Sequence, residues 1–120
     1  MMLWGASLPS AQESKVVPLV TKPLEGIPGK DGSLVRVDLA PGAPGSVRRH
    51  NAPVFVYVLE GSIVMQVKGG KEVTLGPGQT FTETPADIHV VGRNASKTKP
   101  AVFLAFFVKE QGAPAVVPAL

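Results

Sequence analysis

The sequence predicts an all-β domain, either a closed barrel or a jelly roll. Its 120 residues suit one domain with one core, and 44% of them are hydrophobic. The chain contains 13 glycines and 12 prolines, which are spread between short apolar runs. Turn residues at such regular spacing are typical of many short strands, and no segment shows a helical pattern. An immunoglobulin-like sandwich is the alternative, but the chain has no cysteine for the Cys–Trp–Cys signature of that fold.

Eight or nine short strands account for the apolar runs. The first is an edge strand, because Pro18 interrupts it and cannot donate a hydrogen bond to a neighbouring strand. The second alternates, with Val35, Val37 and Leu39 on one face, as expected of a half-buried strand. The third, VFVYVL, is apolar throughout, so both of its faces should be covered. In chain order, the main expected strands cover residues 15–20, 34–39, 54–59, 62–67, 71–75, 79–83, 88–91 and 101–108.

A tight turn at Glu60-Gly61 sets the pairing expected in the middle of the chain. If residues 54–59 and 62–67 form a hairpin around this turn, Val56 lies opposite Met65. Directly opposed residues share a face of the sheet, so Val54, Val56 and Met65 should line the interior. We therefore expect an apolar ligand pocket inside the barrel, in which a small molecule binds.

Composition argues against several classes of function. The net charge is +3, aromatic residues make up 6% of the chain, and basic and aromatic residues form no common platform, so nucleic-acid binding is not expected. Without cysteine there is no disulfide framework, no thiolate zinc site and no cysteine nucleophile. No apolar run approaches the roughly 20 residues that span a bilayer, so we expect no membrane partner.

The first 14 residues are expected to form an arm ahead of the barrel domain, which covers residues 15–120. Residues 1–8 are apolar and residues 9–12 (PSAQ) have the character of a processing site, so the arm is compatible with the remnant of an export signal. The apolar stretch is short and lacks a positive flank, which leaves a plain arm or an edge strand as the alternative. Export would place the protein in the periplasm, and otherwise it would be cytoplasmic.

The two histidines of the chain, His50 and His89, are the first candidates for chemistry. Tight turns separate them along the chain, and in a small barrel such turns can return the chain to the same interior. Neutral imidazole is the commonest metal ligand, so two histidines at matched barrel positions indicate a metal site. The alternative is that each histidine is a hydrogen-bonded residue of the core or rim.

Two sequence blocks around these histidines resemble the two conserved blocks of the cupin superfamily. The resemblance covers most of the chain and is closest in character to small, exported bacterial cupins. It implies a jelly-roll barrel that usually forms a homodimer and holds a divalent metal, commonly iron, manganese, nickel or zinc. The blocks consist of Pro41-Gly42, His50 and the segment YVLEG at 57–61, followed by GPG at 76–78, Pro85, His89 and Asn94.

Two of the four metal ligands that the resemblance implies are missing. His50 matches the second histidine of the first block, and His89 matches the histidine of the second block. The first histidine position falls on Arg48, whose guanidinium stays charged and cannot bind a metal. The glutamate position falls on Val54. The resemblance therefore implies a degenerate site in which two histidines hold a divalent metal weakly.

Glu83 is a further candidate ligand, because it precedes the Pro85 bend that leads to His89. At the mouth of the pocket it would complete the metal site or act as an acid or base. A glutamate at the end of a strand is more commonly exposed, and we expect Glu83 to lie in solvent.

Three functions are consistent with these residues. The resemblance implies a metal-dependent small-molecule enzyme, an oxidoreductase or an isomerase, in which the metal acts as a Lewis acid or binds oxygen. The alternative is a non-enzymatic module without metal, in which Arg48 and the two histidines bind a small anion such as a carboxylate or phosphate. A barrel with only a structural role is the third, since a fold does not determine a function. The sequence identifies neither the substrate nor a catalytic residue.

Overall fold

The computed structural model describes residues 14–44, 48–50, 52–84, 88–113 and 116–118. For residues 48–50, 88–91 and 116–118 it describes the backbone alone. The arm expected over residues 1–14 therefore lies, apart from Ser14, outside the described residues.

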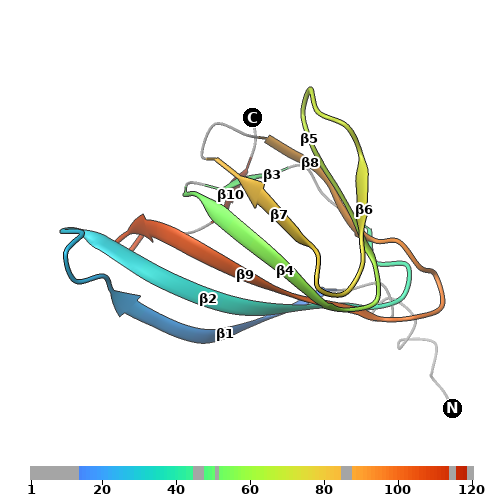
Figure 1. Ribbon diagram of the computed structural model, residues 1–120, viewed down its shortest axis with the longest axis horizontal. Helices are drawn as coiled ribbons and strands as arrows, with labels where there is room; N and C mark the ends of the chain where they lie inside the picture. Colours follow the sequence, from blue (N-terminus) through green and yellow to red (C-terminus); the bar gives the residue numbers. More distant parts are fainter. Residues whose placement is uncertain (1–13, 45–47, 51, 85–87, 114–115, 119–120) are drawn as a thin grey trace, which may run out of the picture.

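Within the described residues, two five-stranded antiparallel sheets pack face to face (Figure 1). The first sheet has the strand order β1-β2-β9-β4-β7, and the second has the order β10-β3-β8-β5-β6. No helix long and apolar enough to cross a membrane occurs in this part of the chain. The strands are β1 (Ser14–Pro23), β2 (Lys30–Leu39), β3 (Arg48–His50), β4 (Val54–Glu60), β5 (Ile63–Val67), β6 (Val73–Leu75), β7 (Thr80–Glu83), β8 (Ile88–Asn94), β9 (Ala101–Glu110) and β10 (Val116–Pro118).

The chain passes repeatedly from one sheet to the other, which is the connectivity of a jelly roll. β2 is in the first sheet, β3 in the second, β4 in the first and β5 in the second again. The prediction of an all-β jelly-roll barrel is therefore confirmed. β1 is an edge strand, as its proline predicted, and a bulge interrupts its pairing with β2 between Pro18 and Val20.

The predicted hairpin of residues 54–59 and 62–67 is wrong. β4 pairs with β7 and β9, whereas β5 pairs with β6 and β8, so Val56 is not the partner of Met65. The turn between them moves the chain to the other sheet. At its centre Gly61 has a φ of 73°, and a Cβ atom there would lie 2.4 Å from the carbonyl oxygen of Pro100. A glycine in this turn thus lets two strands of different sheets follow each other directly.

The interior nevertheless contains the residues that the wrong pairing placed there. Val54, Val56 and Met65 are all buried, because alternation along each strand fixes the face whichever strand is the partner. They belong to one hydrophobic cluster between the sheets, together with the fully buried Val58 and with Ile63. At these positions the space between the sheets is packed core.

Asn94, at the end of β8, connects the two sheets through buried hydrogen bonds. Its Nδ2 atom donates to the carbonyl oxygens of Lys99, Ala40 and Leu39 at 2.7, 3.1 and 3.3 Å. Its Oδ1 atom accepts a hydrogen bond from the backbone N–H of Ser96 at 2.8 Å. β8 belongs to the second sheet and Leu39 ends β2 of the first, so this side chain holds the sheets together at one end of the barrel.

Candidate functional site

Four strand ends meet at the end of the barrel opposite Asn94. β3 ends at His50 and β4 begins at Val54, while β7 ends at Glu83 and β8 begins at Ile88. β3 lies beside β8 in the second sheet, and β4 lies beside β7 in the first. The chain therefore passes from one sheet to the other after His50 and again after Glu83, at the same end. We call this region, defined by residues 48–50, 52–54, 83–84 and 88–89, the histidine end.

The backbone register places His89 on the inner face of the second sheet. Gly92 pairs with the buried Met65, so strict alternation would give the next inner position to Val90. A bulge between Gln66 and Val67 shifts the register, and His89 pairs with Val67 instead. Val67 follows Met65 by two residues and lies on the same face, which makes the position of His89 an inner one.

Arg48 is the direct neighbour of His89 on β3. Paired residues of an antiparallel sheet share a face, and His50 follows Arg48 by two residues. The register thus brings Arg48, His50 and His89 to one face of the second sheet at the histidine end. The structure does not describe the side chains of these three residues, so their roles stay predictions.

Glu83 is buried, and the expectation that it would lie in solvent is wrong. The side chain is at the end of β7, and the residue is 3% exposed. It pairs directly with Val54, which is 2% exposed, and Val54 pairs in turn with Phe107. Phe81, two residues earlier, packs against the hydrophobic cluster, so Phe81 and Glu83 share the inner face. The fold therefore carries a carboxylate into the apolar interior at the histidine end.

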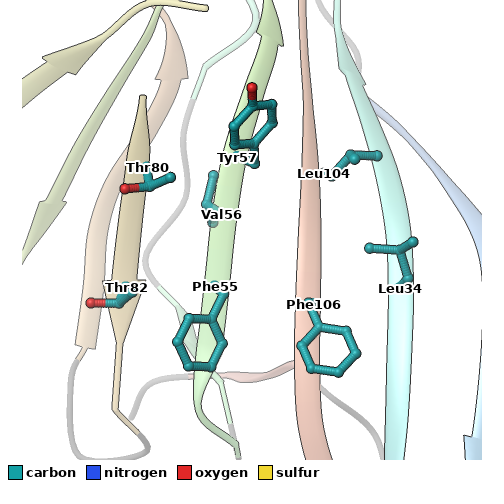
Figure 2. Close-up of a pocket in the computed structure, with 8 residues that line it drawn as sticks. All are labelled: Leu34, Phe55, Val56, Tyr57, Thr80, Thr82, Leu104 and Phe106. Atoms are coloured by element: carbon teal, nitrogen blue, oxygen red, sulfur yellow. The ribbon is translucent and has the colours of Figure 1, made fainter. Parts of the chain in front are cut away.

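A shallow apolar pocket that was not predicted from the sequence lies on the outer face of the first sheet (Figure 2). Its volume is about 310 Å³, and it lies over strands β2, β9, β4 and β7. Phe55 and Phe106 sit side by side in it, and Tyr57 and Leu104 form the next row. The signal for it was present in residues 54–59, whose outward positions are as apolar as their inward ones.

Among the side chains that the structure describes, two surface ion pairs of the first sheet shift the pKa of one partner. Arg36 donates hydrogen bonds to Asp38 on the outer face of β2, and this interaction raises the pKa of Arg36. Lys30 donates to Glu110, and this hydrogen bond with the positive charge lowers the pKa of Glu110. Among the side chains that the structure describes, no three His, Asp or Glu residues gather into a metal-binding group.

Comparisons with known proteins agree with this fold. The Cupin domain family matches residues 35–107, and no curated protein matches the chain. A cupin-like protein from Thermotoga maritima is 19% identical, with a TM-score of 0.68 over 88% of this chain and 75% of that one. An oxalate oxidase in complex with the substrate analogue glycolate is 25% identical, with a TM-score of 0.68 over 94% of this chain and 57% of that one.

A third similar structure is the DMSP lyase DddQ from Ruegeria pomeroyi. It is 19% identical, with a TM-score of 0.63 over 73% of this chain and 43% of that one. The chain thus spans less than half the length of the DMSP lyases that it matches. The family match runs from the middle of β2 into β9 and takes in more than half of the chain, including the histidine end. On this match and on the shared jelly roll, the protein belongs to the cupin family.

Proposed function

We propose that this cupin is a metal-dependent oxidoreductase or isomerase of a small molecule, with one divalent ion held by His50 and His89. The observation that carries the proposal is the register at the histidine end. A bulge gives His89 an inner position, and the pairing of β3 with β8 gives His50 the same face. Two imidazoles on one face of a barrel suit iron, manganese, nickel or zinc.

The residues at this end fit such an ion, but two histidines would bind it with lower affinity than a full set of four ligands. His50 and His89 would hold the metal, which would supply Lewis-acid or oxygen-binding chemistry. Arg48 offers donors alone, and its charge opposes a cation nearby. Two unit charges about 4 Å apart interact by about 4 kcal/mol at an effective dielectric of 20, and a divalent ion doubles that value. The same charge favours an anionic substrate, which a guanidinium binds and orients through paired hydrogen bonds.

A module that binds a small anion without metal is the second candidate. Arg48 favours it, because this cation takes the place of a histidine ligand directly beside His89. The structural neighbours also include an enzyme that binds small carboxylates, the oxalate oxidase in complex with glycolate. On this alternative, oxalate or glycolate would raise the melting temperature of the metal-free protein, because a ligand of the folded state stabilises it.

Metal content tests the proposal directly. The protein is purified without a metal-binding tag, and metal per chain is measured by elemental analysis before and after incubation with iron, manganese, nickel or zinc. His50→Ala and His89→Ala variants are measured beside it. We expect up to one metal per wild-type chain and loss of metal in both variants. Absence of metal from the wild-type protein after all four incubations would refute the proposal and favour the anion-binding module.

A further inference from the structure

Buried polar side chains gather on the inner face of the first sheet, toward the histidine end. Of the four polar residues that are buried in the described part of the chain, three belong to this sheet, namely Asp31, Ser33 and Glu83. Alternation along β2 places Asp31 and Ser33 on the same face as the buried Leu39. The fourth, Asn94, binds backbone groups at the opposite end of the barrel. The interior therefore becomes polar at one end of an otherwise apolar core.

Asp31 and Lys109 form an ion pair in this polar region. They are direct partners on β2 and β9, so their side chains leave the sheet on the same face. The Nζ atom of Lys109 lies 3.6 Å from the Oδ2 atom of Asp31, and the two side chains are only 11% and 12% exposed. The backbone N–H of Val108, beside Lys109, donates to the carbonyl oxygen of Pro53 at 3.4 Å. The pair therefore lies next to the segment that enters β4 at the histidine end.

The distance within this pair is too long for a hydrogen bond. Hydrogen bonds between an ammonium and a carboxylate have N–O distances of about 2.7–2.9 Å. Two charges that leave water are stabilised by each other only when their geometry is good and the remaining donors are satisfied. The exposed pair on the outer face of the same two strands, Lys30 with Glu110, is in direct hydrogen-bond contact. The buried pair is thus the looser of the two, although stability alone would favour the reverse.

Two hydroxyl groups lie in the adjacent row of the same face. The Oγ atom of Ser33, two residues along β2 from Asp31, is 2.5 Å from the Oγ1 atom of Thr21 on β1. Adjacent rows on one face of a strand are about 7 Å apart, and direct cross-strand partners about 5 Å. We call Thr21, Asp31, Ser33 and Lys109 the polar corner. Its three strands, β1, β2 and β9, lie together at one edge of the first sheet (Figure 1).

The polar corner is within reach of one small molecule from the histidine end. Lys109 follows Phe107 by two residues on β9, and Phe107 is the partner of Val54 at the start of β4. Two residues along a strand and one strand across correspond to about 8 Å between the Cα atoms of Lys109 and Val54. A ligand held at the polar corner can therefore extend toward the histidine end.

A cation and an anion side by side are complementary to a ligand that carries a matching pair of groups. A bare anion would gain the ammonium of Lys109 but would be repelled by Asp31. A carboxylate with a hydroxyl or amino group on the adjacent carbon avoids this conflict. Its carboxylate accepts hydrogen bonds from Lys109, and its hydroxyl or ammonium donates to Asp31.

We propose that Asp31 and Lys109 determine the specificity of this barrel for small carboxylates with a hydroxyl or amino group on the adjacent carbon. The inference rests on the proposed function in one respect, that a small molecule binds at the histidine end. It adds the chemical class of that molecule and the two residues that select it. It also gives the loose buried ion pair a role, because the ligand supplies the hydrogen bonds that the pair itself does not make.

Calorimetric titration of the full chain with three small probes tests this specificity. The protein is freed of metal first, because glycolate itself binds divalent ions. Glycolate carries a hydroxyl beside its carboxylate, glycine carries an ammonium, and acetate has no donor. We expect glycolate or glycine to bind at least about tenfold more tightly than acetate, and the tighter of the two identifies the donor group. Equal affinity for all three probes, or binding of none, overturns the inference.

Three variants assign the effect to the polar corner. Lys109→Met keeps the length of the side chain and should lower the affinity for the favoured probe at least about tenfold. Asp31→Asn keeps the shape and should remove the preference over acetate. The matched control is Lys30→Met, which removes the same charge from the outer face of the same two strands and should change neither result. Binding to Lys109→Met as tight as to wild type overturns the inference.

NMR of the wild-type protein decides if the variants do not fold. Shifts of the Lys109 side-chain signals on addition of the favoured probe, with those of Lys30 unchanged, support the inference, and unshifted Lys109 signals overturn it. Titration with Co²⁺, whose visible absorption reports its coordination, tests the proposed metal site separately. Co²⁺ binding without a preference among the probes overturns the specificity and leaves the proposed function standing. A preference among the probes without Co²⁺ binding supports the specificity and overturns the metal-dependent function.

Discussion

Replacing Asn94 should cost several times more stability than replacing an exposed polar residue of the same loop. The side chain makes hydrogen bonds with both its donor group and its acceptor, and all four partners are backbone groups. Asn94→Ala removes about three independent bonds, because two of the three Nδ2 contacts share one hydrogen. At about 1 kcal/mol for each bond, the loss is about 3 kcal/mol, with a further contribution from carbonyl groups left buried and unsatisfied.

Asn94→Asp has nearly the same shape and makes the reason testable. Its second oxygen would face the three carbonyl oxygens of Lys99, Ala40 and Leu39, which disfavours the ionised form and raises the pKa of the new carboxyl. A raised folded-state pKa stabilises the variant below the unfolded-state pKa, and this contribution is lost as the pH rises. Asn94→Asp should therefore approach wild-type stability in acid and fall well below it at neutral pH.

Urea unfolding followed by circular dichroism measures both effects. The control is Ser96→Ala in the same loop, which removes an acceptor for the exposed backbone N–H groups of Thr98 and Lys99. We expect it to cost about 1 kcal/mol or less, because water replaces the hydroxyl. A loss of about 3 kcal/mol at Asn94 corresponds to a fall in Tm of roughly 12–20 °C. If Asn94→Ala costs no more than Ser96→Ala, the reasoning from buried hydrogen bonds is refuted.

A turn glycine, a surface ion pair and the arginine of the histidine end give three further predictions. Gly61→Ala should lower the free energy of unfolding in urea by about 3 kcal/mol or more, because this residue has a positive φ and a Cβ atom there would contact a backbone oxygen. Gly69 is the control: it has a φ of 85° but open space around it, so Gly69→Ala should cost about 1 kcal/mol. In NMR titrations, Lys30→Met should raise the lowered pKa of Glu110, whose small contribution to stability is present above its ordinary pKa and disappears as the pH falls through the folded-state value. Arg48→His should raise the affinity for Co²⁺ at least about tenfold by replacing a cation with an imidazole, and an unchanged affinity would contradict the inner-face register.

The fold was predictable because its signals are local. Glycine and proline between short apolar runs indicate strands and turns wherever the strands pair, and alternation alone placed Val54, Val56 and Met65 inside. The partner of each strand was not predictable in this way. A tight turn such as Glu60-Gly61 looks the same in sequence whether the chain returns along its own sheet or crosses to the other sheet. The packing of Gly61 against Pro100, a contact between distant residues, decides the crossing here.

The candidate site shows the same division between local and distant signals. The burial of Glu83 was within reach of the sequence, because Phe81 is two residues away on a strand and an apolar Phe81 implies an inner face for both. The inner position of His89 was not predictable from the sequence. Alternation along β8 back from Asn94 gives Val90 the inner position, and the bulge that moves it to His89 has no sequence signal of its own.

The charges at the histidine end connect the two candidate functions. A site of three neutral histidines and one glutamate carries a charge of −1, and a divalent ion brings it to +1. With Arg48, two neutral histidines and an ionised Glu83, the same region would be neutral before it binds metal and would carry +2 afterwards. On the proposed function, the metal would therefore be held less tightly than in a full site, and the metal-loaded barrel would attract a small carboxylate more strongly. Metal binding and anion binding would then reinforce each other, and such a coupling is reciprocal. Oxalate should therefore raise the affinity for Co²⁺ by the same factor by which Co²⁺ raises the affinity for oxalate. Both affinities are first corrected for the complex that Co²⁺ and oxalate form in solution.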